Sequence, residues 1–179
     1  VADGGRVLAE RYKVDLPNYG EFDEKRVFHA GPEIGGPVNF RGVRIGIPIC
    51  EDIWGDLAVC ETLAESGAEI LLVPNGSPYH RGKMDMRHQV AIRQVIETGL
   101  PLIYANQFGG QDELVFDGGS FAIGADRSLT FQMSQFEEAL AVSAWKRTQD
   151  GWACESGPMS RLPESEEADY HACMVGLRD

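Results

Sequence analysis

Residues 43–54 read VRIGIPICEDIW, and this stretch decides the fold. Its first seven residues, 43–49, form a short apolar run that favours a β-strand. Two further apolar runs have the same character, at residues 70–74 and 102–105. Between the runs lie two stretches with side chains at helical spacing, each closed by a glycine, at residues 57–66 and 85–98. The alternation predicts strand, helix, strand, helix, strand, and therefore the α/β class.

The rest of the chain is less regular. Residues 120–124 and 128–133 are two short apolar runs joined by a turn, which predicts a β-hairpin. We predict an α/β sandwich over residues 1–148, a surface linker over 149–164 and the beginning of another unit at 165–179. A helix is expected at 166–177, with no evident partner in this chain.

Composition excludes several classes of protein. Of 179 residues, 43% are apolar, and 16 basic side chains face 28 acidic ones, for a formal net charge of −12. Such a surface repels phosphate backbones and anionic lipids, so neither nucleic acid nor membrane is an expected partner. No apolar run approaches the roughly 20 residues of a membrane span. The first six residues lack signal-peptide character and no Met opens the chain, so we expect a cytoplasmic protein whose true start lies upstream.

The four cysteines are scattered, with no C-x-x-C pair, so neither a zinc site nor a disulfide scaffold is expected. Cys50 directly follows the strand predicted at 43–49 and precedes a turn into a helix. A thiol near a helix N-terminus gains thiolate character, which suits a nucleophile. The alternative is a small buried side chain, as is usual for a free cysteine and as we expect for Cys60.

A thiol nucleophile also needs a base and a group that holds the developing oxyanion. The sequence context singles out none of the four histidines, His29, His80, His88 and His171, so we expect surface or structural roles, with a papain-like pairing left open. Lys13 ends a short strand predicted at 6–12 and could place its ammonium near a thiolate. The alternative is a solvated surface charge, as is usual for a lone lysine.

Three ordered motifs resemble the carbon–nitrogen hydrolases, the nitrilase superfamily. They are K-x-x-L-P-x-Y-x-x-F-x-E from Lys13, G-I-x-I-C-E-D-x-W from Gly46, and P-N-G-S-P-Y from Pro74. The resemblance covers about residues 6–145. Within the superfamily, residues 16–24 and 77–83 are most similar to the glutaminase domains of glutamine-dependent NAD synthetases, and residues 169–179 resemble the entry helix of the synthetase domain.

The resemblance implies a nitrilase-like four-layer α-β-β-α sandwich whose N-terminal part is missing here. It implies a Glu-Lys-Cys triad in which Cys50 is the nucleophile and Lys13, with the backbone N–H after Cys50, stabilises the tetrahedral intermediate. The general-base Glu of the family lies on a segment earlier than this sequence, and neither Glu10 nor Glu24 is that residue. The implied substrate-binding residues are Tyr19, Ser77, Lys83 and Glu51.

The implied reaction is hydrolysis of L-glutamine without a cofactor, which supplies ammonia to an ATP-dependent synthetase domain that amidates deamido-NAD. ATP and Mg²⁺ belong to that domain, whose S-G-G-x-D-S loop is absent here. A homo-oligomer is expected for the parent, and impaired activity for this stretch alone because the general-base Glu lies outside it. The alternatives are a stand-alone amidase acting on another amide, and an inactive scaffold or oligomerisation module.

Overall fold

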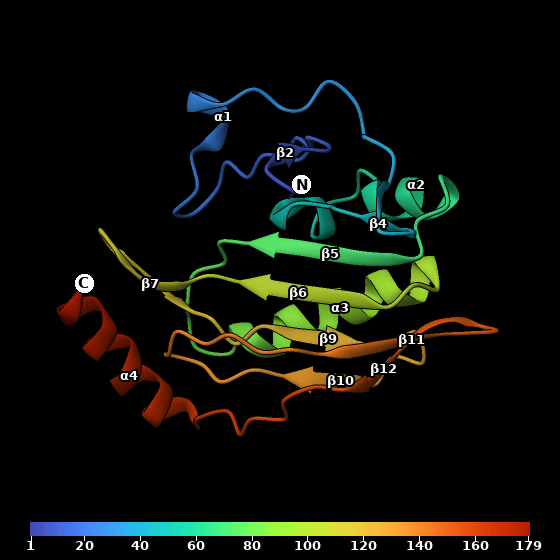
Figure 1. Cartoon of the computed structure of the whole chain (residues 1–179). Coiled ribbons are helices and arrows are strands. Elements are labelled where there is room, and N and C mark those ends of the chain that lie inside the picture. Colours follow the sequence, from blue (N-terminus) through green and yellow to red (C-terminus); the bar gives the residue numbers. More distant parts are fainter.

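The computed structural model describes residues 1–179 and is built around one six-stranded sheet (Figure 1). The spatial order is β10-β9-β6-β5-β4-β3. The strand bounds are β3 Val38–Phe40, β4 Val43–Gly46, β5 Ile70–Asn75, β6 Leu102–Asn106, β9 Phe121–Ile123 and β10 Leu129–Gln132. Strands β4, β5 and β6 are parallel, and the other pairings are antiparallel. The predicted strands at 70–74 and 102–105 and the predicted hairpin are confirmed.

Two helices, α2 (Val59–Glu65) and α3 (Lys83–Thr98), pack on one face of this sheet and form the core with it. Alternate strand residues such as Leu71, Val73 and Tyr104 point into that core and are fully buried. Gly46 allows the close approach, because a Cβ there would lie 2.8 Å from Leu71 Cδ2. Both predicted helices are confirmed, and the α/β class is confirmed with them.

The opposite face of the sheet is also apolar. Ile45, Leu72 and Ile103 are half-buried there, and a hairpin of β11 (Ala144–Thr148) and β12 (Gly151–Ser156) lies against them. Trp145 and Trp152 of this hairpin line a cavity of about 310 Å³ together with the sheet residues. The predicted linker is therefore wrong for residues 151–156, because Trp152 and Cys154 alternate inward as a strand pairing with β11.

The predicted strand over residues 6–12 is also wrong beyond Val7. Only β1 (Ala2–Asp3) and β2 (Arg6–Val7) pair, and residues 8–12 have no regular structure. The strand predicted at 43–49 likewise ends at Gly46. Its last residues leave the sheet because Pro48 has no N–H to donate and Ile49 donates its N–H to the Asp52 carboxylate at 2.8 Å.

Helix α4 (Ser165–Arg178) packs on a second hairpin, β7 (Phe108–Gln111) and β8 (Leu114–Asp117) (Figure 1). It buries Ala168, Ala172 and Val175. The helix was expected without a partner; the unpredicted hairpin β7–β8 supplies one. No helix of the structure has both the length and the apolar character needed to cross a membrane.

Candidate active site

The parallel strands bring three polar residues to one edge of the sheet. Cys50 follows β4, Ser77 follows β5, and Asn106 ends β6. Carboxyl ends of parallel strands are where sites of α/β proteins gather. Cys50 opens a short 3₁₀ turn, Cys50–Ile53, with a left-handed φ of 49°, a conformation that non-glycine residues rarely adopt. The predicted strand-to-helix elbow is therefore present, although its helix is a single 3₁₀ turn.

The Cys50 thiol is half-buried, and opposing influences act on it. Burial raises its pKa, whereas the charge of Lys13 and the backbone N–H of Gly76 lower it. The carboxylates of Glu51 and Glu24 raise it further. Burial has the largest effect, so the thiol form is favoured until a base removes the proton. None of these charged groups is a histidine, and His88 instead meets Gln132 at 3.1 Å and packs on Phe121. Its neighbours favour a structural role for His88.

Lys13 is held in place by Glu24. The Lys13 ammonium donates to both carboxylate oxygens, Oε1 at 2.6 Å and Oε2 at 2.7 Å. The two side chains are 16% and 25% exposed, so this is a largely shielded pair rather than a solvated surface charge. Glu24 opens the short helix α1 (Glu24–Val27). Its contact with Lys13, eleven residues earlier, was not predicted, because no regular spacing joins a loop residue to a helix start.

Asp52 ties the Lys13 segment to the Cys50 turn. Its carboxylate is buried and accepts three backbone N–H groups, from Val14 at 3.0 Å, Asp15 at 2.7 Å and Ile49 at 2.8 Å. Two of these donors directly follow Lys13 and the third directly precedes Cys50. Asp52 therefore fixes the backbone next to Lys13 against the backbone next to Cys50. Sequence reasoning assigned it no role, although its place within the CED motif was a signal.

Three further predicted site residues lie around the same elbow. The Tyr19 hydroxyl donates to the Glu51 carboxylate at 2.8 and 2.9 Å, and burial raises the pKa of both groups. The Lys83 ammonium lies 4.6 Å from the centre of the Trp54 ring, and burial lowers its pKa. The charges of Glu51 and Cys50 act on Lys83 in the opposite direction, which places all three in one electrostatic environment.

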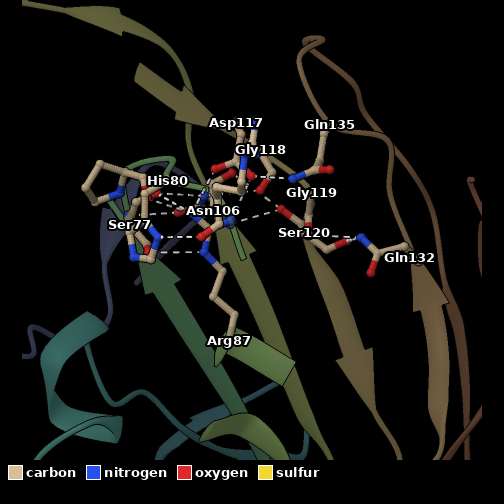
Figure 2. Close-up of polar contacts among 12 residues, drawn as sticks. Ser77, His80, Arg87, Asn106, Asp117, Gly118, Gly119, Ser120, Gln132 and Gln135 are labelled. Carbon is tan, nitrogen blue, oxygen red and sulfur yellow. Dashed lines mark hydrogen bonds and ion pairs between the residues drawn. The ribbon is translucent and has the colours of Figure 1, made fainter. Parts of the chain in front are cut away.

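Ser77 is buried and held from two sides. The Asn106 carboxamide accepts its N–H at 2.9 Å and donates to its carbonyl at 3.1 Å, and the Arg87 guanidinium donates to its hydroxyl at 3.1 Å (Figure 2). Arg87 is itself paired with Asp117 below the surface. Nothing in the sequence indicated a buried Arg, because Arg87 lies at an ordinary position of an amphipathic helix.

A cavity of about 480 Å³ is lined by Asn106, the loop at 133–139 and the end of α4. Its lining includes Gly118, Ser120 and Asp179 but neither Cys50 nor Lys13. The groups whose charges act on the thiol thus lie outside this hollow. No group of three or more His, Cys, Asp or Glu side chains is arranged to hold a metal ion.

Comparison with known proteins agrees with this geometry. Residues 1–149 match the carbon–nitrogen hydrolase family. A glutamine-dependent NAD(+) synthetase of Rhodobacter capsulatus is 44% identical over 179 residues, which is 100% of this chain and 32% of that protein. A counterpart in Xanthomonas campestris is 43% identical over 123 residues, covering 68% of this chain and 22% of that protein. The chain thus spans about a third or less of these relatives.

Solved structures show the same relationship. A glutamine-dependent NAD+ synthetase from Acinetobacter baumannii, in complex with adenosine diphosphate, superposes with a TM-score of 0.89 at 32% identity, covering 99% of this chain and 33% of that one. A mutant of a nitrilase-superfamily amidase from Nesterenkonia superposes with a TM-score of 0.63 at 28% identity, covering 72% of this chain and 47% of that one. The likeness to the synthetase is therefore both more extensive and closer in shape than the likeness to the amidase.

Proposed function

Because this chain belongs to the carbon–nitrogen hydrolase family, we propose that it hydrolyses the side-chain amide of L-glutamine through Cys50 and releases ammonia. The observation that carries the proposal is the Cys50 elbow, on whose thiol the charge of Lys13 acts. Glu24 holds the Lys13 ammonium, and Asp52 holds the backbone that follows Lys13. A thiol, a fixed cation and a polar pocket are the parts that acyl transfer from an amide requires.

In the proposed reaction, Cys50 Sγ loses its proton to a base and attacks the amide carbon of glutamine. Negative charge develops on the amide oxygen, where the Lys13 ammonium and the backbone N–H of Glu51 stabilise it. The carbon–nitrogen bond then breaks, and the proton passes to the departing nitrogen, which leaves as ammonia. Water attacks the resulting thioester, the carbon–sulfur bond breaks, and glutamate and the free thiol are released.

The α-amino and α-carboxylate groups of glutamine need partners of opposite charge. We assign the ammonium to Glu51, whose carboxylate Tyr19 already orients, and the carboxylate to Lys83 and Ser77. Burial lowers the pKa of Lys83, so bringing a carboxylate beside it would favour the charged form that binds.

The base that accepts the thiol proton is assigned to a carboxylate outside residues 1–179. Within these residues, the two carboxylates that act on Cys50 are already engaged, Glu24 by Lys13 and Glu51 by Tyr19. A protein restricted to residues 1–179 is therefore expected to bind glutamine analogues but to turn glutamine over slowly.

We further propose that the ammonia serves an ATP- and Mg²⁺-dependent synthetase unit that amidates deamido-NAD, with no cofactor needed for the glutaminase step. Homology over the whole chain to a glutamine-dependent NAD(+) synthetase, together with the matching structure of another, supports this assignment. Helix α4 would then be the point of connection, because it follows the linker expected from the sequence.

Covalent labelling with a glutamine-like diazoketone, followed by intact-mass measurement and peptide mapping, tests the proposal. We expect one adduct, on Cys50, that excess glutamine suppresses. Cys60 serves as an internal control, since burial raises its pKa to about 12 and keeps it a thiol. Equal labelling of Cys154 and Cys173, or labelling that glutamine does not suppress, would overturn the proposal.

The likeness to the Nesterenkonia amidase, a mutant of which has been solved in complex with butyramide, favours a second candidate, a stand-alone amidase acting on another amide. A simple aliphatic amide distinguishes the two. Glutamine hydrolysis should exceed that of the aliphatic amide if Lys83 and Glu51 recognise charged ends, and the reverse ratio would favour the amidase.

A further inference from the structure

A buried ion pair lies directly behind Ser77. Arg87 on α3 is 0% exposed and Asp117 on β8 is 1% exposed. The guanidinium donates two hydrogen bonds of 2.8 Å, one to each carboxylate oxygen of Asp117. Removing two charges from water is costly even when they pair well, so burial of this pair is poorly explained by stability alone. The remaining contacts of Arg87 indicate what else it does.

All other hydrogen bonds of Arg87 end on the turn at Ser77 and Pro78. Nε donates to Ser77 Oγ at 3.1 Å, and Nη2 donates to the carbonyls of Ser77 at 2.7 Å and Pro78 at 3.1 Å. Figure 2 shows the side chain reaching from its helix to this turn, with Asn106 beside Ser77. The rigid guanidinium fork thereby fixes both the backbone and the hydroxyl of Ser77.

The direction of these bonds determines what the Ser77 hydroxyl can do. Arg87 can only donate, so Ser77 Oγ accepts from it and keeps its own proton for another acceptor. The turn at Ser77 follows β5, which pairs in parallel with β4, the strand before Cys50. The backbone N–H of the preceding residue, Gly76, also lowers the pKa of the Cys50 thiol. Ser77 is thus a hydroxyl donor at the same edge of the sheet as Cys50.

We propose that Arg87 is a positioning residue that directs the Ser77 hydroxyl proton toward the amino-acid end of the substrate. Asp117 neutralises the guanidinium, so that the site receives an oriented donor without an additional net charge. The inference rests on the proposed function, since it presupposes a ligand carboxylate at Ser77. A competing acceptor is the buried Tyr104 hydroxyl, whose pKa burial raises and the Ser77 hydroxyl lowers.

The test compares two reactions of Cys50 in the full-length protein. The glutamine-like diazoketone gives a half-saturating concentration that depends on recognition, whereas iodoacetamide reports only the reactivity of the thiol. We expect Ser77→Ala to raise the half-saturating concentration about tenfold, the effect of losing one hydrogen bond to a charged group. Arg87→Lys should raise it similarly, because an ammonium cannot reproduce the fork. The iodoacetamide rate should stay within about twofold in both variants.

The double variant supplies the decisive readout. If Arg87 acts through Ser77, Ser77→Ala combined with Arg87→Lys should be no more than about twofold worse than Ser77→Ala alone. The inference is overturned if the effects of the two single variants on the half-saturating concentration multiply in the double variant. It is also overturned if the diazoketone and iodoacetamide reactions slow equally, because Arg87 would then have only a structural role. Tyr104→Phe is the matched control and should leave the half-saturating concentration unchanged; a shift as large as that of Ser77→Ala would also overturn it.

Two outcomes separate this inference from the proposed function. If the wild-type protein shows no saturable labelling, the proposed function fails and the inference fails with it. If wild-type labelling saturates and Arg87→Lys matches it, only the role of Arg87 is wrong. Should Arg87→Lys not fold, Asp117→Asn takes its place, because weakening the pair should loosen the same guanidinium and raise the half-saturating concentration. No rise in that variant overturns the inference.

Discussion

Replacing Asp52 by Asn should both destabilise the protein and slow the reaction of Cys50. The carboxylate accepts N–H groups from Val14 and Asp15 on Oδ1 and from Ile49 on Oδ2. An Asn oxygen can still accept the first two, but its NH₂ group then faces the N–H of Ile49, donor against donor. One hydrogen bond to a charged group, about 1.5–3 kcal/mol, is lost and the half-buried N–H of Ile49 is left unpaired. We therefore expect the free energy of unfolding to fall by about 2–4 kcal/mol.

The functional consequence follows from what the three donors flank. Loosening Asp52 lets the Lys13 ammonium move away from Cys50, and this charge is one of the influences that lower the pKa of the thiol. Cys50 should then react more slowly with iodoacetamide near neutral pH. Urea unfolding gives the stability, and hydrogen exchange of peptides covering residues 10–16 and 46–52 locates the loss. Asp56→Asn is the matched control, because Asp56 is exposed and its substitution removes the same negative charge close to Asp52 in the sequence. A stability loss in Asp52→Asn equal to that control, or an unchanged Cys50 rate, would refute the reasoning.

Three further perturbations test other parts of the site. Lys13→Gln should shift the iodoacetamide pH–rate profile of Cys50 to higher pH, because the positive charge that lowers the thiol pKa is gone; an unshifted profile would place Lys13 away from the thiol. Lys83→Met should weaken binding of the diazoketone about tenfold or more and leave binding of an aliphatic amide unchanged, both measured by competition. Equal losses of affinity for the two compounds would show that Lys83 does not bind the carboxylate. Arg81 and the Tyr79 hydroxyl lower the pKa of Asp169, so the contribution of Asp169 to α4 docking should be present above about pH 4 and be lost as pH falls through the lowered pKa. In the wild type, protection of residues 165–178 from hydrogen exchange should therefore fall in acid. In Asp169→Asn the same protection should already be lower at neutral pH. Equal protection in the variant and the wild type at neutral pH would contradict this prediction.

Local patterns in the sequence predicted most of the central sheet. Apolar runs with turn residues at their ends predicted β5 and β6, and the helical spacing predicted α2 and α3, because these signals depend only on neighbours along the chain. The position of Cys50 after β4 was predictable for the same reason. At residues 151–156 a distant partner decided the outcome, because Trp152 packs against the apolar face of the sheet. At residues 6–12 the local pattern predicted a strand, but only Arg6 and Val7 pair, with Ala2 and Asp3.

The sequence by itself determined the α/β class and the position of Cys50 after a strand, and it offered a set of polar residues as candidates to surround that thiol. Only the tertiary structure decided which of those residues meet. Lys13 pairs with Glu24, Asp52 bridges two segments 38 residues apart, and Arg87 lies buried against Asp117 and Ser77. The physical reason is that a carboxylate or guanidinium can be buried only where several distant groups converge on it, and such convergence has no periodic trace along the chain.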